Sequence, residues 1–404
     1  MKLFKYILRT FLLVFTLSVT THVNAQSDYD LGSMDSVDIC LLTCGPGQES
    51  YSMFGHTALR IHDKARQQDL AINYGMFSFS QPNFILRFIL GQTDYTMGIQ
   101  DMSDFIWQYQ HEGRWIKQQK LQLSRKEKWE ILQAIQENSR PENITYRYNF
   151  FFNNCTTKAR DIILDHINRQ EDVKGMAYIP STYRKEIHKW NASSPWTQFG
   201  EDLLLGVSAD FDISQSEYQF LPENLSNDWN HIQLTGHFDS LQNQKMPLVE
   251  STSWLISKQD KTENSGYILT PTVCFALLFI FTVVISLYEY RTGKKIWALD
   301  IFFYFATGIV GIVLFAMLFS KHPTVQCNLQ ILMFNPLVLA FGWSVIKSLQ
   351  KRAWSKWAIR YSIFYGICLV LMLIGAFIQT YQPGIIILAL SLLFRIIFNL
   401  EYNR

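Results

Sequence analysis

The sequence predicts an exported α+β domain followed by an all-α bundle of five transmembrane helices. Three observations support this fold class. The chain has 404 residues, which exceeds one ordinary domain, its first 25 residues have the pattern of a secretory signal, and long apolar spans fill the part after residue 266. We therefore expect three parts: a signal peptide at 1–25, a periplasmic domain at 26–266 and a transmembrane domain at 267–404.

The N-terminal segment predicts export. A basic start between Lys2 and Arg9 precedes an apolar core of about ten residues from Phe11, and residues 23–25 form a small-x-small cleavage site. That core is too short to cross a bilayer, which takes roughly 20 residues. We expect cleavage and a mature chain that starts near Gln26, with an uncleaved anchor as the alternative.

Residues 26–266 predict a mixture of strands and helices. The apolar alternation indicates strands at Ser36–Thr43, Thr57–His62 and Leu70–Tyr74, and helices at Asp101–Tyr109 and Glu127–Glu137. The stretch after Trp196 is read as short helices and loops that return the chain to the membrane.

The C-terminal part predicts five spans, near 267–288, 296–319, 329–346, 361–380 and 384–400. Basic residues gather in the connections after the first and third spans, whereas the other two connections hold only Lys321. The positive-inside rule puts the basic connections and the C-terminus in the cytoplasm and the large domain outside. Asp300 and Arg395 fall near cytoplasmic ends, and we expect them to reach the interface.

Composition excludes several classes of partner and cofactor. The formal net charge is +2, and no basic stripe interleaves with aromatic residues, so nucleic acid is not expected as a partner. Cys40 and Cys44 share one predicted strand, about 13 Å apart, which is too far for a disulfide. No Cys-x-x-Cys or His-x-x-x-His pattern indicates zinc. Cys155 is left as an unpaired thiol in an exported domain.

Cys155 has the sequence context of a nucleophile. Asn153 or Asn154 is a suitable N-cap for the helix predicted by the spacing of Ala159, Ile162, Ile163 and Ile167. A thiol in the first turn lies at the positive end of the helix dipole, which favours the thiolate. A buried, inert cysteine is the alternative interpretation.

His56 is the best candidate for the base. It follows Gly55 at the start of a predicted strand, where the glycine permits close backbone approach. Imidazole has a suitable pKa to exchange a proton with a thiol near neutrality. His62 is about 20 Å further along the strand, and His166 is on the helix of Cys155 itself. A purely structural His56 remains the alternative.

The order of these residues resembles that of permuted papain-like thiol hydrolases, which include NlpC-type relatives and lecithin:retinol acyltransferase-like enzymes. In this group a strand-borne histidine precedes the cysteine, as His56 precedes Cys155. The resemblance implies a permuted papain-like (NlpC-like) domain and a third polar residue on the next strand. Asn73 stands there, and its amide oxygen would orient the imidazole. An asparagine in a turn is the alternative.

A fuller set of motifs resembles the Lnb-type lipoprotein N-acyltransferases, over nearly the whole mature chain. The matching segments are 54–60, 73–75, 82–84, 112–114, 148–157, 322–323 and 335–337. One departure is Gln330, where this resemblance leads us to expect a second asparagine after Asn328.

The resemblance implies a two-step acyl transfer in a bacterial inner membrane, with no metal, nucleotide or other cofactor. Cys155, with His56 as base, would take an acyl chain from a phospholipid as a thioester and pass it to the α-amine of an S-diacylglyceryl-cysteine apolipoprotein. The Cys155 backbone N–H would bind the oxyanion. The residues expected to assist or to position substrate are Asn154, Asn153, Tyr51 and Gly55.

Two other functions share parts of this pattern. A membrane-tethered cysteine peptidase or amidase that acts on cell-wall peptides would use the same Cys–His pair, although a single span would serve it. A non-catalytic membrane scaffold would keep Cys155 as a core residue. If lipoproteins still gain their N-acyl chain in cells that rely on a Cys155→Ser variant, both the scaffold and the peptidase interpretations are favoured. An acyl group on Cys155 separates the acyltransferase from the peptidase.

Overall fold

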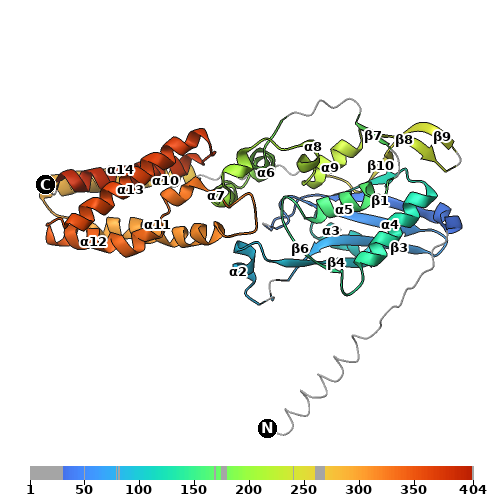
Figure 1. The fold of residues 1–404 in the computed structure, drawn as a ribbon, viewed down its shortest axis with the longest axis horizontal. Coiled ribbons are helices and arrows are strands. Elements are labelled where there is room, and N and C mark those ends of the chain that lie inside the picture. The colour runs from blue at the N-terminus through green and yellow to red at the C-terminus, as the bar shows by residue number, and fades with distance from the viewer. Residues whose placement is uncertain are drawn as a thin grey trace, which may run out of the picture.

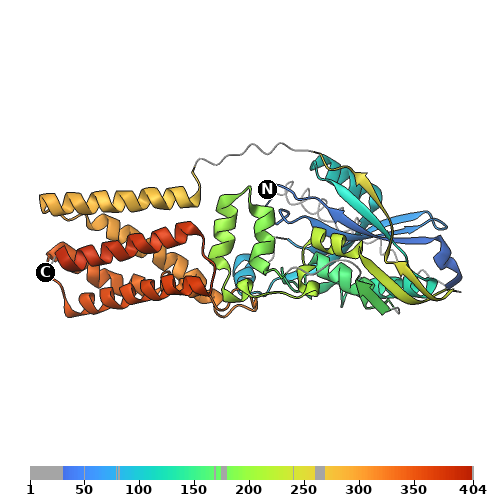
Figure 2. The ribbon, with the colours of Figure 1, turned by 90° about the horizontal axis from the view of Figure 1, so that it is seen from above.

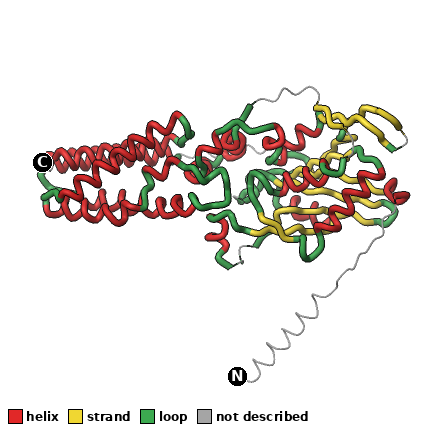
Figure 3. Tube along the Cα trace, in the orientation of Figure 1, coloured by secondary structure: helices red, strands yellow, loops and turns green. Residues whose placement is uncertain are grey.

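The computed structural model describes residues 31–402 apart from 50, 79, 81, 168–169, 174–179, 240 and 260–268. A domain that contains all the described strands lies at one end of the molecule, and a bundle of long helices lies at the other (Figures 1 and 3). The predicted signal peptide at 1–25 and the predicted boundary at residues 266 and 267 lie outside the described residues.

The N-terminal domain is built on a seven-stranded sheet in which every neighbouring pair is antiparallel. The strand order is β10-β5-β1-β2-β3-β4-β6. The bounds are β1 Val37–Cys44, β2 His56–Asp63, β3 Gln68–Met76, β4 Asp94–Asp101, β5 Ile116–Leu121, β6 Thr145–Arg147 and β10 Val249–Ile256. The α+β fold class is therefore confirmed for this part of the chain.

Helices cover both faces of the sheet, because the central strands are apolar on both faces. Ile39 and Leu41 of β1 join one core cluster, whereas Leu42 and Cys44 join another. The first cluster packs under α4 (Arg125–Asn138), α5 (Cys155–Leu164) and α9 (Pro222–Trp229), and the second under α3 (Met102–His111). The remaining elements of the domain are η1 Leu31–Ser36, α2 Phe84–Ile89, α6 Tyr183–Asn191, α7 Pro195–Leu204, η2 Val207–Asp210, α8 Gln215–Tyr218, and the small sheet of β7 Gln170–Val173, β8 Ile232–Phe238 and β9 Leu241–Pro247.

The three early strands and the two predicted helices are present, with ends shifted by one or two residues. The interpretation of the chain after Trp196 was partly wrong. Short helices do follow, but residues 232–256 form three strands instead of helices and loops. The physical reason is that β10 is an edge strand whose central residues are exposed, so it lacks the apolar alternation that marks a strand in a sequence.

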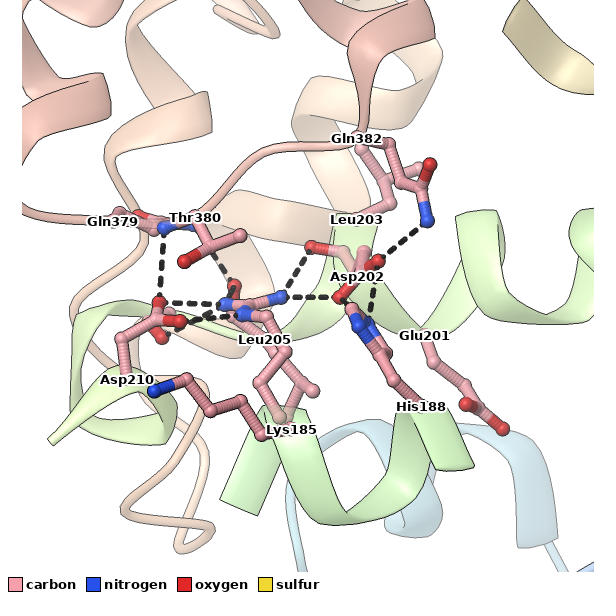
Figure 4. A network of polar contacts seen from close by, with 12 residues as sticks. Lys185, His188, Glu201, Asp202, Leu203, Leu205, Asp210, Gln379, Thr380 and Gln382 are labelled. Atoms are coloured by element: carbon pink, nitrogen blue, oxygen red, sulfur yellow. Dashed lines mark hydrogen bonds and ion pairs between the residues drawn. The ribbon is translucent and has the colours of Figure 1, made fainter. Parts of the chain in front are cut away.

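A buried polar network joins the domain to the bundle. Helices α6 and α7 stand between the sheet and the long helices (Figure 2). Arg184 of α6 pairs with Asp202 at 2.6 Å and Asp210 at 2.9 Å. These carboxylates also accept hydrogen bonds from the connection before the last helix, from Gln382 Nε2 at 2.9 Å and the Thr380 N–H at 3.1 Å (Figure 4). The network thus holds the N-terminal domain in a fixed position relative to the bundle.

Five helices of the bundle are long and apolar enough to cross a membrane. The spans are α10 Pro271–Thr292, α11 Trp297–Met317, Leu329–Lys351, Lys356–Phe377 and α14 Pro383–Tyr402. The third span consists of η3 Leu329–Leu332 and α12 Leu337–Lys351, and the fourth consists of α13 Lys356–Ile374 and η4 Gly375–Phe377. The third predicted span, 329–346, is not one helix: η3 is separated from α12 at Asn335 and Pro336. Proline explains the break, since it cannot continue the hydrogen-bond ladder of a preceding helix.

Asp300 and Arg395 correct the prediction that both reach the interface. The Arg395 side chain is 2% exposed and donates five hydrogen bonds, two to Asp300, two to Glu289 and one to Ser286. Asn399 Nδ2 donates to Asp300 at 2.7 Å. These residues lie on α10, α11 and α14, so the cluster ties three helices together inside the bundle.

Candidate active site

The thiol of Cys155 stands at the first residue of α5, which begins there because Asn154 caps it. Oδ1 of Asn154 accepts from the N–H groups of Thr156 and Thr157 at 2.8 and 2.9 Å, and Oγ1 of Thr157 accepts from the N–H of Asn154 at 2.8 Å. This reciprocal capping satisfies N–H groups that a helix start leaves unpaired. Cys155 is partly exposed and forms no disulfide.

The amide of Asn154 is fully engaged. Its Nδ2 donates to the carbonyl oxygens of Phe150 at 2.6 Å and Phe220 at 2.9 Å. With Oδ1 committed to the cap, the side chain fixes the helix start and has no N–H left for an oxyanion. The structure therefore gives Asn154 a positioning role instead of the predicted oxyanion contact.

His56 begins β2, beside a glycine that no other residue could replace without strain. Gly55 has φ +79°, and a Cβ at this position would lie 2.5 Å from the Cys44 carbonyl oxygen. Nε2 of His56 donates to Oδ1 of Asn73 at 3.0 Å, which leaves Nδ1 as the second ring nitrogen. The imidazole is also close enough to the Cys155 thiol for the charge of each group to shift the pKa of the other. The start of β2, the second half of β3 and the start of α5 thus meet beside the central strands of the sheet. We call this site, formed by Cys155, His56 and Asn73, the corner.

The electrostatics of the corner favour a thiolate–imidazolium pair. Burial acts to raise the pKa of the Cys155 thiol, but the charge of His56, its hydrogen bond and the backbone of Thr57 outweigh burial and lower that pKa. Burial acts to lower the pKa of His56, and the Cys155 thiolate and the Asn73 amide together raise it. In contrast, burial raises the pKa of Cys40 and of Cys44 to about 12, which leaves those thiols inert.

Three neighbours of the thiol were missed by sequence reasoning. The Thr57 backbone is hydrogen-bonded to the Cys155 sulfur, and Oγ1 of Thr57 lies 3.0 Å from Oγ1 of Thr156, which joins β2 to α5. A Cβ at Gly75 would lie 3.6 Å from Cβ of Cys155 and 3.7 Å from the Tyr148 ring. The glycine thus leaves room between ring and thiol. The only sequence signal was that these residues lie inside the segments 54–60, 73–75 and 148–157.

The other predicted positions lie in the surrounding loops. Asn153 donates from Nδ2 to the Arg147 carbonyl at 2.7 Å, and exposed Tyr51 packs edge-on against Phe77 with ring centroids 5.6 Å apart. The structure therefore brings Cys155, His56, Asn73 and Asn154 together with Gly55 and leaves Asn153 and Tyr51 at the rim.

The connection between α11 and α12 reaches the turn before Cys155. Nδ2 of Asn149 donates to Nδ1 of His322 at 3.1 Å, and Oδ1 of Asn149 accepts from the N–H groups of Phe151 and Phe152. His322 is also hydrogen-bonded to the Phe88 backbone, while burial lowers the pKa of His322 overall and keeps it neutral at pH 7. His322 thus contacts the turn before Cys155 from the connection between α11 and α12.

Gln330, the departure noted in the sequence, serves the junction between the two parts. Its Nε2 donates to the Asp202 carbonyl at 2.8 Å, and its backbone N–H donates to Oδ1 of Asn328 at 3.0 Å. Asn328 Nδ2 in turn donates to the Leu203 carbonyl at 2.8 Å. A glutamine amide is long enough to make this contact, so the departure has a structural use.

Comparison with known protein families finds two matches. Residues 24–188 match the family model described as the Lnb N-terminal periplasmic domain, and residues 261–404 match the one described as the Lnb transmembrane domain. No curated protein and no solved structure matches the chain. The two matched segments make up most of the chain, follow the order of its two parts and include Cys155, His56 and Asn73. The chain is therefore a membrane protein of the Lnb family, with a periplasmic N-terminal domain and five membrane-spanning helices.

Proposed function

We propose that this protein is a lipoprotein N-acyltransferase of the bacterial inner membrane that works through an acyl-thioester on Cys155. One observation carries the proposal. A partly exposed thiol lies beside an imidazole whose charge helps to lower the pKa of that thiol, in a chain that also has five membrane-spanning helices. The thiolate is the nucleophile of such enzymes, and an adjacent base activates it.

In the first step the Cys155 sulfur attacks the ester carbonyl carbon of a phospholipid. The carbon–sulfur bond forms, the ester carbon–oxygen bond breaks, and His56 gives its proton to the departing lysophospholipid hydroxyl. The backbone N–H at the start of α5 is the donor best placed for the negative oxygen, because helix starts present unpaired N–H groups. Asn73 holds the imidazole in one tautomer through Nε2.

In the second step the α-amine of a diacylated apolipoprotein attacks the thioester. The nitrogen–carbon bond forms, the carbon–sulfur bond breaks, and the amine proton passes to His56, which restores the starting ion pair. An amide is more stable than a thioester, so this step is downhill without ATP. The reaction is ping-pong and needs no cofactor.

The arrangement of the domain also supports a permuted papain-like fold for the thiol part. Histidine and asparagine come from adjacent antiparallel strands, and the cysteine comes from a helix start that follows them in the sequence. This is the Cys-His-Asn logic of thiol hydrolases in a different chain order. The predicted topology, with the C-terminus in the cytoplasm, puts the corner on the periplasmic side, where both lipid substrates are found.

The direct test is mass spectrometry of the purified protein after incubation with phospholipid vesicles. We expect an acyl group on Cys155 and an equal amount of lysophospholipid, and we expect the acyl group to leave when a diacylated lipopeptide with a free α-amine is added. Cys327→Ser is the matched control, because Cys327 is an exposed cysteine away from the corner. No acyl group on Cys155, together with cleavage of cell-wall peptides, would favour the peptidase.

A further inference from the structure

Helix α2 presents an apolar surface to its surroundings. Ile85 is 76% exposed, Leu86 55% and Phe88 47%, so half of this short helix is apolar and uncovered. Single exposed apolar residues are ordinary on a protein surface, but a contiguous group of them marks an interaction site. The only charged residue of α2, Arg87, is paired with Asp94 of β4 at 2.5 Å. The exposed apolar face of α2 therefore favours contact with an apolar partner.

The position of α2 indicates that this partner is lipid. Figure 1 shows α2 at the end of the domain that faces the bundle. The Leu90 carbonyl, just after α2, accepts from the N–H of Lys321 at 3.0 Å, four residues beyond the end of α11. The Phe88 ring also contacts the His322 ring, with centroids 6.3 Å apart. Helix α2 is thus held where a membrane-spanning helix leaves the bilayer, and apolar side chains at that depth lie against acyl chains.

A row of aromatic rings runs from α2 toward the thiol. Centroids are 6.3 Å apart for Phe88 and Phe84, 5.8 Å for Phe84 and Phe77, and 4.9 Å for Phe77 and Tyr95. Tyr95 and Tyr148 stack at 4.0 Å. These five residues come from four separate segments of the chain, so local sequence does not explain their contact. We call them the aromatic row.

The aromatic row ends beside the nucleophile. The Tyr148 ring and Cβ of Cys155 approach the same point, the position where Gly75 has no side chain. Burial and the nearby Cys155 thiolate both raise the pKa of Tyr148, so its hydroxyl stays neutral and offers no charge to repel a lipid. A continuous series of aromatic contacts therefore connects α2 to the surroundings of the sulfur.

We propose that the apolar face of α2 inserts into the outer leaflet and that the aromatic row guides the acyl chain of a membrane phospholipid to Cys155. The inference rests on the proposed function for the identity of the reaction, but membrane insertion of α2 stands apart from it. The occupant is a phospholipid acyl chain and not a protein segment, because the face adjoins the membrane-spanning helices and carries no unpaired charge.

The first experiment measures insertion without any activity. Two variants of the full-length protein are reconstituted separately in phospholipid vesicles. One carries the photo-crosslinking residue in the change Leu86→p-benzoylphenylalanine, and the matched control carries Ile99→p-benzoylphenylalanine. Ile99 of β4 is 50% exposed and lies about 16 Å along the strand from Asp94, the partner of Arg87. After irradiation we expect phospholipid adducts at least tenfold more abundant at position 86 than at 99. Equal yields, or adducts only to protein, would overturn the insertion.

The second experiment measures guidance. We compare Ile85→Glu with Ile99→Glu for the rate of Cys155 acylation by long-chain phospholipid in vesicles and by a short-chain water-soluble ester. We expect Ile85→Glu to slow acylation by the phospholipid at least tenfold and acylation by the soluble ester less than twofold, with Ile99→Glu normal on both. Equal losses on both donors would overturn guidance. If no ester acylates the wild-type thiol, the proposed function fails, while the crosslinking result still decides the insertion of α2.

Discussion

The corner around Cys155 and the cluster around Arg395 are both polar groups set among apolar ones, but they differ in how much of their bonding capacity is used. Arg395 has five N–H donors and uses all five on Glu289, Asp300 and Ser286. Cys155 is partly exposed, and the charge of His56 helps to lower the pKa of its thiol although burial acts to raise it. A saturated cluster stabilises a fold, whereas an unsaturated pair can react with something new.

The largest effect we expect is on activity, at the corner. Cys155→Ala should reduce acyl transfer by at least about 10³-fold, because the covalent intermediate is lost. Its thermal unfolding in detergent should match that of the wild type. A large fall in melting temperature with partial activity would mean that the thiol serves packing, and the contrast between corner and cluster would disappear.

The cluster should behave in the opposite way. Arg395→Met removes the main partner of two buried carboxylates, because Asp300 then keeps only Asn399 and Glu289 keeps only Lys295 and the Ile296 N–H. The change should destabilise the protein by about 3–5 kcal/mol. We expect a lower melting temperature in detergent and poor yield, with normal activity per folded molecule. A triple variant with Arg395→Met, Glu289→Gln and Asp300→Asn removes the stranded charges and should recover part of the loss. No recovery would show that the cluster has a role beyond neutralising its own charges.

The pH dependence of thiol reactivity sharpens the contrast. The pKa of Cys155 is lowered and that of His56 is raised, so each charge favours the other and the ion pair is stabilised relative to the isolated groups. It is lost as pH falls through the Cys155 pKa or rises through the His56 pKa. In His56→Asn the thiolate loses its partner, and alkylation by iodoacetamide at pH 7 should slow by roughly tenfold for each pH unit that the thiol pKa rises. An unchanged pH profile in this variant would contradict the pairing.

The smallest effect on stability should come from a residue at the periphery of the polar network around Arg184 that joins the domain to the bundle. Gln382→Ala removes one of several hydrogen bonds to Asp202, which keeps Arg184 and His188 as partners. We expect a loss of about 1 kcal/mol, the usual net value of one hydrogen bond. Chemical unfolding in detergent measures it, and acylation of Cys155 should be unchanged. A loss above that of Arg395→Met would mean that the junction and not the bundle limits stability.

Local patterns were enough to predict the positions of Cys155 and His56 in the fold. The capped start of the helix at Cys155 and the strand start at His56 follow from short-range signals, namely an N-cap residue, helical spacing and a glycine before a strand. The broken third span was harder to predict, because hydropathy does not register the effect of Pro336 on the helix. The edge strand β10 escaped detection because its central residues are exposed and lack an apolar alternation.

The roles of the supporting residues could not be predicted, because they depend on distant contacts. Asn154 loses its predicted oxyanion role to the Phe220 carbonyl, 66 positions further along the chain. Arg395 finds Glu289 on a helix that begins more than a hundred positions earlier. No periodicity encodes such pairs, and a single sequence does not reveal which polar groups meet after folding.

The hydrogen bond between Asn149 and His322 sets an order of events during biogenesis. The nascent turn before Cys155 leaves the ribosome long before residue 322 is made, and 173 positions separate the two partners. The contact can form only after α10 and α11 have been integrated. A secreted fragment that ends before α10 would lack this hydrogen bond. We therefore expect the site around Cys155 to reach its final conformation only after the protein has been inserted into the membrane.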